Sequence, residues 1–252
     1  MDTLSAITLN VGSPQRQWLR RRHLLITELL DLKPDLIALQ QLNLTAGQGW
    51  WLARQLNARL GQTHYQIFMQ RRRHWWQGNF EGVAILSRLP VVTTDVLDLG
   101  FGGYVALRAN VEVVTGHTID FVCTYFRPAR RLAEVREQQA MRLFSWLSEP
   151  GQALYQMIAG DLNEVPSGLA VRYLKQRYVS AYEQAHGREP LATWPTTTRE
   201  PWPEWAGCLD YLLVSPNIVV DTAVLCFRTP DSRDTTLYPS DHVGLYTRFR
   251  LR

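Results

Sequence analysis

Apolar residues fall in short runs along this chain, each bounded by polar residues or by glycine and proline, as is typical of buried strands. Strands are expected at residues 4–11, 36–41, 65–69, 82–87, 91–99, 104–113, 118–125, 154–159, 208–214, 223–227 and 243–249. Short connections join the four runs between residues 82 and 125, which predicts a meander and therefore a mainly antiparallel sheet in this half. Gly160 follows the run at 154–159 and is expected to let the backbone turn where a larger side chain would be crowded.

Helical spacing of apolar residues predicts helices at 13–32, 50–60, 130–147 and 167–178. Ser13 and Pro14 resemble an N-cap followed by a first-turn proline. In the third helix, the residues expected on or near the buried side are Leu132, Met141, Leu143, Phe144 and Leu147. Residues 190–206 contain four prolines and three tryptophans, which favours an ordered loop over one end of a sheet. The pattern as a whole predicts two packed sheets covered by helices, with polar strand ends gathered at one edge.

The composition changes this picture little. A chain of 252 residues with 46% hydrophobic residues can bury a substantial core, and one domain spanning 1–252 is expected. No apolar run approaches the roughly 18 residues of a membrane helix, and the chain enters a strand at once without a leader-like segment, so a soluble, cytoplasmic protein is expected. Three cysteines at 123, 208 and 226 lack paired spacing; this indicates reduced, buried thiols and neither a disulfide framework nor a zinc site.

The charge is more informative, because 25 of the 27 basic residues are arginine and the net charge is +4. Arginine binds phosphate through a two-pronged fork, so the balance fits an anionic substrate, although a GC-rich genome would give the same bias. The run from Arg20 to His23 is interpreted as a solvated face of the first helix.

A second basic stretch joins Arg71, Arg72 and Arg73 to Trp75 and Trp76. Arginines beside tryptophans could hold a phosphate backbone and stack a base. The alternative is a strand-edge loop in which the indoles cover the rim of the sheet. The spacing does not decide between these two interpretations.

Candidate chemistry lies at the strand ends. Asp161 and Asn163 leave the strand at 154–159 together, and alternate residues of an extended segment share a face. A carboxylate can activate water or hold a cation, and an amide can donate to the charge that develops on a phosphate oxygen. The alternative is a turn in which both side chains bond their own backbone. Further polar strand ends are Asn10, Gln41 and Asp210, with Asp241 and His242 before the last strand.

The ordered set of motifs resembles the endonuclease/exonuclease/phosphatase superfamily, the fold of deoxyribonuclease I and exonuclease III. The matching motifs are Leu9-Asn10-Val11, residues 34–40, residues 82–88, Gly160-Asp161-Leu162-Asn163, Leu209-Asp210-Tyr211 and Ser240-Asp241-His242. They occur in the family's order over nearly the whole chain. The resemblance implies an α/β fold, a four-layer α/β/β/α sandwich of two mainly antiparallel sheets flanked by helices (DNase I-like).

The resemblance also implies roles. His242 would touch the scissile phosphate, and Asp210 would orient it and favour the imidazolium form. Asp161 would orient or deprotonate the attacking water, and Asn163 would donate to the pentavalent phosphorus centre. Tyr125 falls where relatives place a residue that hydrogen-bonds the phosphate.

Arg136 corresponds to a family arginine at the site, where it would contact substrate or buttress neighbouring residues. The same comparison implies that Asn10 and Asp241 support a divalent cation, Mg²⁺ or Mn²⁺. The family strand ends Leu-Gln-Glu, and its glutamate is the principal metal ligand, but this chain has Gln41 there. Exchanging a carboxylate for an amide removes a charge from a site that holds Mg²⁺ by few protein ligands, so weak binding is expected.

Three explanations of Gln41 stay open: a natural enzyme with a weaker or relocated metal, a non-catalytic descendant that binds phosphate, and a substitution made to trap substrate. Glu81 or Glu164 could supply the missing charge. The favoured hypothesis is a divalent-metal-dependent phosphodiesterase, nuclease-like, with DNA or RNA as the expected polymer. The alternatives are a phosphate- or nucleic-acid-binding module without turnover and a phospholipid or small-molecule phosphatase, since Thr193-Trp194-Pro195 is similar to a Thr-Phe-Pro stretch in such relatives. The sequence does not predict an oligomeric state.

Overall fold

The structure is a computed structural model that describes residues 3–12, 15–61, 65–72, 80–114, 116–129, 131–196 and 206–252. Twelve strands occur in this part of the chain: β1 Leu4–Asn10, β2 Leu36–Asn43, β3 Gln66–Arg71, β4 Glu81–Ser87, β5 Val91–Gly100, β6 Tyr104–Val114, β7 His117–Tyr125, β8 Tyr155–Asp161, β9 Val179–Ser180, β10 Asp210–Val214, β11 Ile218–Cys226 and β12 Gly244–Leu251. Its helices are α1 Gln15–Leu32, α2 Gln48–Leu60, α3 Ala133–Leu147, α4 Leu169–Leu174 and α5 Ala181–His186.

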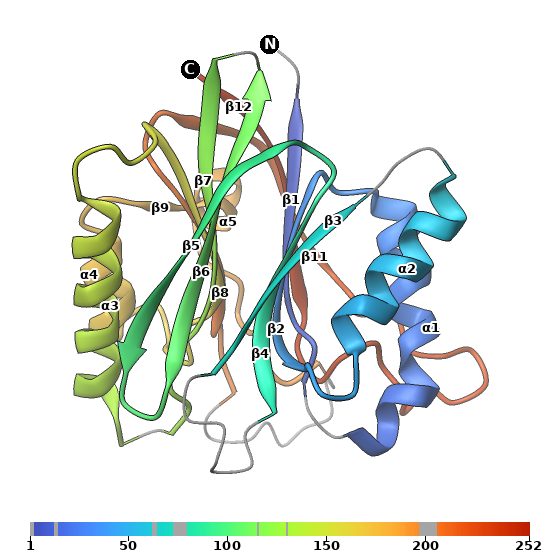
Figure 1. Cartoon of the computed structure of the whole chain (residues 1–252). Coiled ribbons are helices and arrows are strands. Elements are labelled where there is room, and N and C mark those ends of the chain that lie inside the picture. Colours follow the sequence, from blue (N-terminus) through green and yellow to red (C-terminus); the bar gives the residue numbers. More distant parts are fainter. Residues whose placement is uncertain are drawn as a thin grey trace.

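The strands form two six-stranded sheets, in the orders β11-β12-β1-β2-β4-β3 and β5-β6-β7-β8-β10-β9. They pack face to face, with α1 and α2 outside the first sheet and α3 and α4 outside the second (Figure 1). Successive side chains of a strand point to opposite faces of its sheet, so one strand can pack against the other sheet and against a helix. In β1, Ala6 packs into the core shared with the second sheet, whereas Ile7 and Leu9 pack against Leu25 of α1. The predicted four-layer α/β/β/α sandwich is confirmed.

Both sheets are mixed but mainly antiparallel. Only β1–β2 and β7–β8 are parallel among the described strand pairs. The predicted four-strand meander is wrong in one respect, because β4 pairs with β2 and β3 in the first sheet while β5, β6 and β7 form an antiparallel meander in the second. The short segment after Ser87 therefore passes from one sheet to the other. The apolar pattern of each strand cannot distinguish that crossing from a hairpin, because it does not show which sheet the next strand joins.

Gly160 lies inside β8 and does not form a turn. It is paired with Thr124 of β7 and Tyr211 of β10. A Cβ at this position would overlap the carbonyl oxygen of Thr124, so the expected crowding is present although the turn is not.

The helices differ from the expectation at several points. α3 begins at Ala133, and its Met141 is 44% exposed; Ala140 and Leu143 fill the buried side. The expected helix at 167–178 reduces to the six residues of α4, followed by β9 and α5, which were not predicted. Ser13 and Pro14 lie outside the described residues. None of the helices in the described ranges combines the length and apolar character needed to cross a bilayer. All three cysteines are buried free thiols.

Candidate active site

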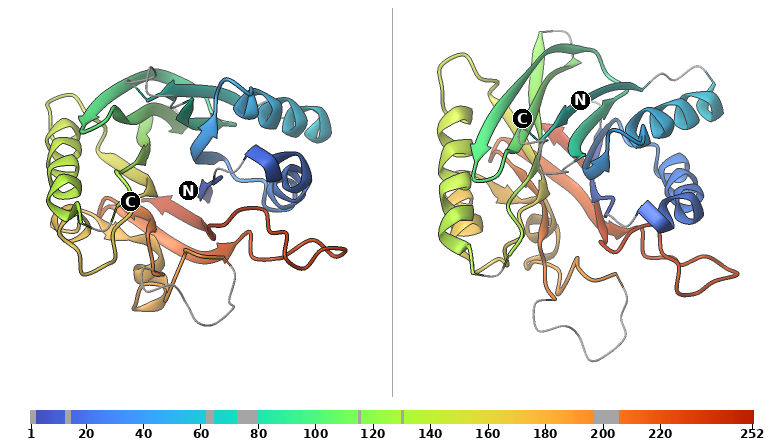
Figure 2. Two further views of the ribbon diagram at one scale, coloured as in Figure 1. Left: turned by 90° about the horizontal axis from the view of Figure 1, so that it is seen from below. Right: turned by 60° about the horizontal axis from the view of Figure 1, so that its bottom comes forward.

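Strand register gathers the predicted residues at one edge of the sandwich. Asn10 ends β1 opposite Gln40 of the parallel strand β2, and Tyr125 ends β7 opposite Asp161 of the parallel strand β8. β10 runs antiparallel to β8, so its first residue, Asp210, pairs with the last, Asp161. Two sheets thus end in one place with carboxylate, amide and phenol side chains. Figure 2 shows this end of the molecule turned toward the reader.

A cavity of about 690 Å³ opens there. Its lining includes six of the predicted residues: Gln41, Tyr125, Arg136, Asp161, Asn163 and His242. Trp194 and apolar residues such as Pro128, Val165 and Leu209 complete it. A concave site with a few convergent polar groups on a mostly apolar wall is the usual form of a ligand pocket.

His242 and Asp210 form a buried pair at the back of this cavity. The Asp210 carboxylate Oδ2 accepts hydrogen bonds from His242 Nδ1 at 2.9 Å and from the Thr193 hydroxyl at 2.6 Å. Asp210 is fully buried, and its Oδ1 has no hydrogen-bond partner among the described residues. A carboxylate held in this way fixes the tautomer and orientation of the ring. His242 Nε2 is left facing the cavity.

The electrostatics of the pair favour the imidazolium. Burial alone would lower the pKa of His242, but the charge of Asp210 and its hydrogen bond, helped by Asp161 and Asp241, raise that pKa to about 9. The ring therefore carries a proton on both nitrogens at neutral pH, and Nε2–H is a charged donor. Nε2 lies 3.9 Å from Asp161 Oδ2, too far for a hydrogen bond.

Asp161 is buried and bonded on both oxygens. Oδ2 accepts from Asn10 Nδ2 at 2.8 Å, and Oδ1 accepts from the backbone N–H of Asn163 at 2.7 Å. Burial and then the negative charge of Asp210 raise the pKa of Asp161 to about 7, against the lowering effect of His242. A carboxyl group that titrates near neutrality is suited to accept a proton from water.

Asn163 satisfies both interpretations of the Asp-x-Asn motif. Its backbone adopts φ 49° and bonds Asp161, which is the turn expected from the structural alternative. Its side-chain amide donates to the carbonyl oxygen of Phe126 at 3.0 Å and still lines the cavity. Burial raises the pKa of the neighbouring Tyr125 well above its usual value, so its hydroxyl stays a neutral donor.

The three residues expected at the metal differ in what they can offer. Asn10 uses its amide nitrogen on Asp161 and its Oδ1 on the Gly12 N–H at 2.8 Å. Gln41, at φ 55°, donates Nε2 to the Tyr125 hydroxyl at 2.7 Å, which leaves its amide oxygen available. Asp241 is exposed, and its Oδ2 accepts from Trp194 Nε1 at 3.4 Å. Hard oxygen donors with one carboxylate among them fit a hydrated Mg²⁺ or Mn²⁺ held by few protein ligands.

Two other sets of residues are weaker candidates for binding the cation. Ligand atoms of Asp161, Asp210 and His242 all lie within 4.8 Å of one another, but a protonated ring bonded to Asp210 is a poor ligand until it loses its proton. Glu164 lines the cavity, but its carboxylate is bonded to Arg136 Nε at 2.9 Å. Glu81 is near Arg72, at 3.8 Å. Both candidate replacements for the missing glutamate are thus partly neutralised by arginine.

Arg21 is a residue that the sequence interpretation missed. It was assigned to a solvated basic run, yet only 2% of it is exposed. Its Nη2 donates to the carbonyl oxygens of Val11 and Gly12. Burial lowers the pKa of Arg21, and Asp241 counteracts this. A buried cation within the electrostatic influence of Asp241 thus holds the segment after β1. The spacing of Arg21 from Trp18 and Leu25, three and four residues away on the buried face, is a signal that could have identified it.

The basic stretch after β3 is only partly described. Arg72 stacks on the Tyr104 ring at 3.8 Å and donates to the carbonyl oxygen of Gly102 at 3.0 Å, so its guanidinium is used within the fold. Arg71 is half-buried and donates to the Thr45 hydroxyl at 3.3 Å. Arg73, Trp75 and Trp76 lie outside the described residues.

Arg136 is buried at the cavity wall. Besides Glu164, it donates to the carbonyl oxygen of Ala129 at 2.6 Å. It thereby ties the segment after β7 to the segment after β8, and both segments line the cavity.

Thr193 and Trp194 are further residues whose place was not predicted. The Thr193 hydroxyl also accepts the backbone N–H groups of Leu209 and Asp210, at 2.9 and 3.0 Å. Trp194 forms a bridge with Gly207, and its ring centroid lies 6.4 Å from that of His242. The Thr-Trp-Pro stretch was the available signal, but the contact with Asp210 depends on the pairing of Thr193 and Trp194 with Gly207.

Comparison with known proteins relates this fold to solved structures and to a family. No curated protein matches the sequence. The structure is similar to an endonuclease/exonuclease/phosphatase family protein from Bacteroides thetaiotaomicron (TM-score 0.81, 17% identity, covering 100% of this chain and 98% of that one). It is also similar to D. rerio TDP2 complexed with a single-strand DNA product (0.79, 19%, 99% and 100%) and to the human Nocturnin catalytic domain with bound sulfate (0.77, 21%, 99% and 95%).

These TM-scores show a shared fold and nothing further. A family model gives the membership directly, because it matches residues 7–242, nearly the whole chain. Enzymes of this family are typically phosphoester hydrolases that use divalent metals. The chain belongs to the endonuclease/exonuclease/phosphatase family.

Proposed function

We propose that this chain is a divalent-metal-dependent phosphodiesterase of the nuclease type, with residues 1–252 acting as one domain. The observation that carries the proposal is the convergence of Asp161, Asp210 and His242, from three distant segments, on one cavity. The pKa values of Asp161 and His242 are shifted in the directions that water activation and phosphate binding require.

Hydrolysis begins with Asp161 as the base. Its carboxylate takes a proton from water as the water oxygen bonds to phosphorus in line with the ester oxygen that leaves. The bond from phosphorus to that oxygen breaks, and the departing alkoxide takes a proton from solvent. Asn10 and the Asn163 N–H hold both oxygens of Asp161, which keeps the carboxylate oriented and lets it ionise near neutral pH.

Fixed hydrogen-bond donors stabilise the negative charge on the phosphate oxygens. His242 Nε2–H supplies a full positive charge, held in direction by Asp210 and Thr193. Tyr125 O–H and the Asn163 amide line the same cavity. Preorganised donors of this kind are worth about 10²–10³ in rate each. A cation held by Gln41 and Asp241, beside Asn10, would add Lewis-acid stabilisation of the same charge.

The activity should follow a bell-shaped pH profile on a chromogenic phosphodiester. Asp161 must be ionised, so the rate rises through about pH 7, or lower where added Mn²⁺ stabilises the carboxylate. His242 must be protonated, so the rate falls through about pH 9. In Asp210→Asn the charge that raises the pKa of His242 is gone and burial lowers it. The alkaline limb should therefore move toward neutral pH, by at least about one unit. A limb that stays in place in this variant would contradict the assignment of His242.

The substrate we propose is a nucleic-acid strand. Support comes from the D. rerio TDP2 structure, which holds a single-strand DNA product, and from the cavity itself, where the Trp194 indole lies beside the phosphate donor His242. Aromatic side chains stack single-stranded bases without regard to sequence.

Binding of a single-stranded oligonucleotide should weaken linearly with the logarithm of salt concentration, with a slope of about −0.7 for each phosphate contacted. We expect Arg71→Ala to reduce that slope by about one contact, since Arg71 Nη2 is held only by Thr45 among the described residues. Fluorescence anisotropy at several salt concentrations measures both quantities. A flat salt response would favour the phospholipid or small-molecule alternative.

A further inference from the structure

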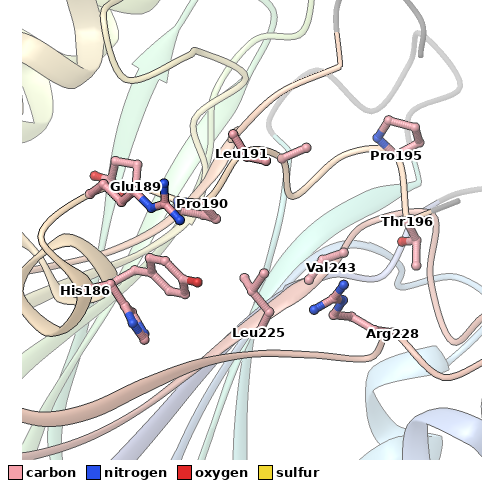
Figure 3. Close-up of a pocket in the computed structure, with 12 residues that line it drawn as sticks. His186, Glu189, Pro190, Leu191, Pro195, Thr196, Leu225, Arg228 and Val243 are labelled. Carbon is pink, nitrogen blue, oxygen red and sulfur yellow. The ribbon is translucent and has the colours of Figure 1, made fainter. Parts of the chain in front are cut away.

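A second pocket, of about 420 Å³, lies between α5, the segment 188–196 and the end of β11. Figure 3 shows its lining, with Thr196 and Arg228 at one end and His186 and Glu189 at the other. Apolar side chains, Leu225 and Val243 among them, form much of the wall. None of the chemistry assigned above uses it.

The charge in this pocket is positive. Arg188 and Arg228 both line it and are exposed, and neither has an ion pair or hydrogen bond to any residue the structure describes. Glu189 is the carboxylate in the lining, but Lys175 Nζ lies 2.9 Å from its Oε1 and the Ser180 hydroxyl donates to its Oε2 at 2.8 Å. Lys175 also bonds Glu183 Oε2 at 2.6 Å. The three cations Arg188, Arg228 and Lys175 therefore exceed the two carboxylates by one positive charge.

A buried hydroxyl points to a ligand. Thr196 lines the pocket and is 6% exposed, and its Oγ1 has no hydrogen-bond partner in the described part of the chain. Leaving a buried hydroxyl unpaired costs about 1–3 kcal/mol, so such groups in folded proteins are usually satisfied by something that binds there. In Figure 3 the hydroxyl faces the same space as the Arg228 guanidinium.

The pocket is tied to the active site by a shared wall. Thr196 N–H donates to the carbonyl oxygen of Asp241 at 2.9 Å, and Val243 N–H donates to that of Thr193 at 2.7 Å. Along these two paired segments, Trp194 and His242 line the active-site cavity, whereas Thr196 and Val243 line the second pocket. The backbone of these two segments therefore separates the active-site cavity from the second pocket.

We propose that this second pocket binds a phosphate group that carries a nucleoside, as in a nucleotide or a nucleic-acid strand. The two arginines and the Thr196 hydroxyl would bind the phosphate oxygens, because guanidinium groups match phosphate geometry and a hydroxyl completes the set. Leu225 and Val243, with the Tyr182 ring, would pack against the nucleoside. This binding requires no hydrolysis and stands apart from the proposed catalytic function.

Calorimetric titration of adenosine 5′-monophosphate and of a nuclease-resistant phosphorothioate oligothymidylate would test this. All pocket and control variants are made in a His242→Asn background. This substitution removes the His242 imidazole, which is proposed to bind phosphate in the active-site cavity. In that background we expect Arg188→Ala/Arg228→Ala to weaken binding by at least about tenfold, and Thr196→Val by about three- to tenfold. Thr196→Val removes an unpaired hydroxyl at nearly constant volume, so the fold should be kept. The matched control is Arg54→Ala/Arg59→Ala, which removes two exposed charges from α2 and should change mononucleotide affinity less than twofold.

Weakening of both probes assigns the pocket to a free nucleotide as well as to a strand, and weakening of the oligonucleotide alone assigns it to a strand. Equal affinities in the pocket variants and in the control would overturn the proposal, as would loss of all binding in His242→Asn. Hydrolysis of a small chromogenic ester by the pocket variants in an otherwise native chain should stay within twofold of the native rate. A failure of this proposal is therefore separate from a failure of the catalytic one.

Discussion

Replacing His242 with asparagine is expected to lower turnover of a chromogenic phosphodiester by about 10³-fold. The asparagine amide can still donate to Asp210 from the position of Nδ1, but the charged Nε2–H that faces the phosphate is lost. The effect should appear in kcat more than in KM, because the ring stabilises charge that develops in the transition state. Steady-state kinetics with saturating Mn²⁺ measures both constants.

The choice of asparagine separates catalysis from folding. Alanine at position 242 would leave Asp210 as an unpaired buried carboxylate, and breaking a buried charge pair in this way costs about 3–5 kcal/mol. His242→Asn also removes the positive partner of Asp210 but keeps a hydrogen bond to it, so this variant should keep cooperative thermal unfolding, with a midpoint below that of the native chain and above that of His242→Ala. Retention of more than a tenth of the native kcat by a folded His242→Asn protein would remove His242 from the mechanism.

The sequence predicted the parts of the site that depend on strand ends. Asn10, Tyr125, Asp161 and Asp210 each stand at the last or first residue of a buried strand, and parallel or antiparallel register places such residues together without knowledge of side-chain contacts. The family motifs supplied the order of the strands. For these reasons the four-layer fold and the set of residues around the cavity could be predicted, although their roles could not be tested by pattern alone.

Features that depend on a helix face or on long-range pairing were not predicted. Arg21 was grouped with its charged neighbours in sequence, but a helix presents residues three or four apart on one face, so Arg21 is buried with Trp18 and Leu25 while Arg20 is exposed. Thr193 is held beside Asp210 by the hydrogen bond from its backbone N–H to Gly207, a residue distant in sequence. Such a contact leaves no periodic signal. The passage of the chain from β4 to a different sheet is missed for the same reason.

Gln41→Glu should convert a weak metal site into a stronger one. A carboxylate there would add a full negative charge beside the cation, and two unit charges 4 Å apart attract by about 4 kcal/mol at the effective dielectric of a protein surface. Even a third of that energy, about 1.4 kcal/mol, corresponds to a tenfold change in affinity. We expect Mn²⁺ to bind at least about tenfold more tightly, and turnover at limiting Mn²⁺ to rise by a similar factor. Electron paramagnetic resonance of free Mn²⁺ measures the affinity independently of turnover.

The local structure should accept this change. Gln41 now donates to the Tyr125 hydroxyl, and a glutamate could accept from the same hydroxyl, because the raised pKa of Tyr125 keeps it protonated. Without metal, the new charge would be close to Asp161 and would raise the pKa of that carboxyl further. The thermal midpoint of Gln41→Glu should therefore fall in chelator and recover with added Mn²⁺ more than that of the native chain. Gln41→Met, of similar length and without an oxygen ligand, should show neither effect.

The result also decides among the explanations of Gln41. Tighter Mn²⁺ binding with a gain in turnover would mean that the remaining residues form a working hydrolase limited by its metal. Tighter binding with no turnover in either form would mean that the cavity retains phosphate and metal recognition without hydrolysis, and the chain would then act as a binding module. Unchanged Mn²⁺ affinity would place the cation away from position 41. The neutralisation of Glu164 by Arg136 and the nearness of Glu81 to Arg72 leave Asp161 and Asp241 as the carboxylates to which it could then move.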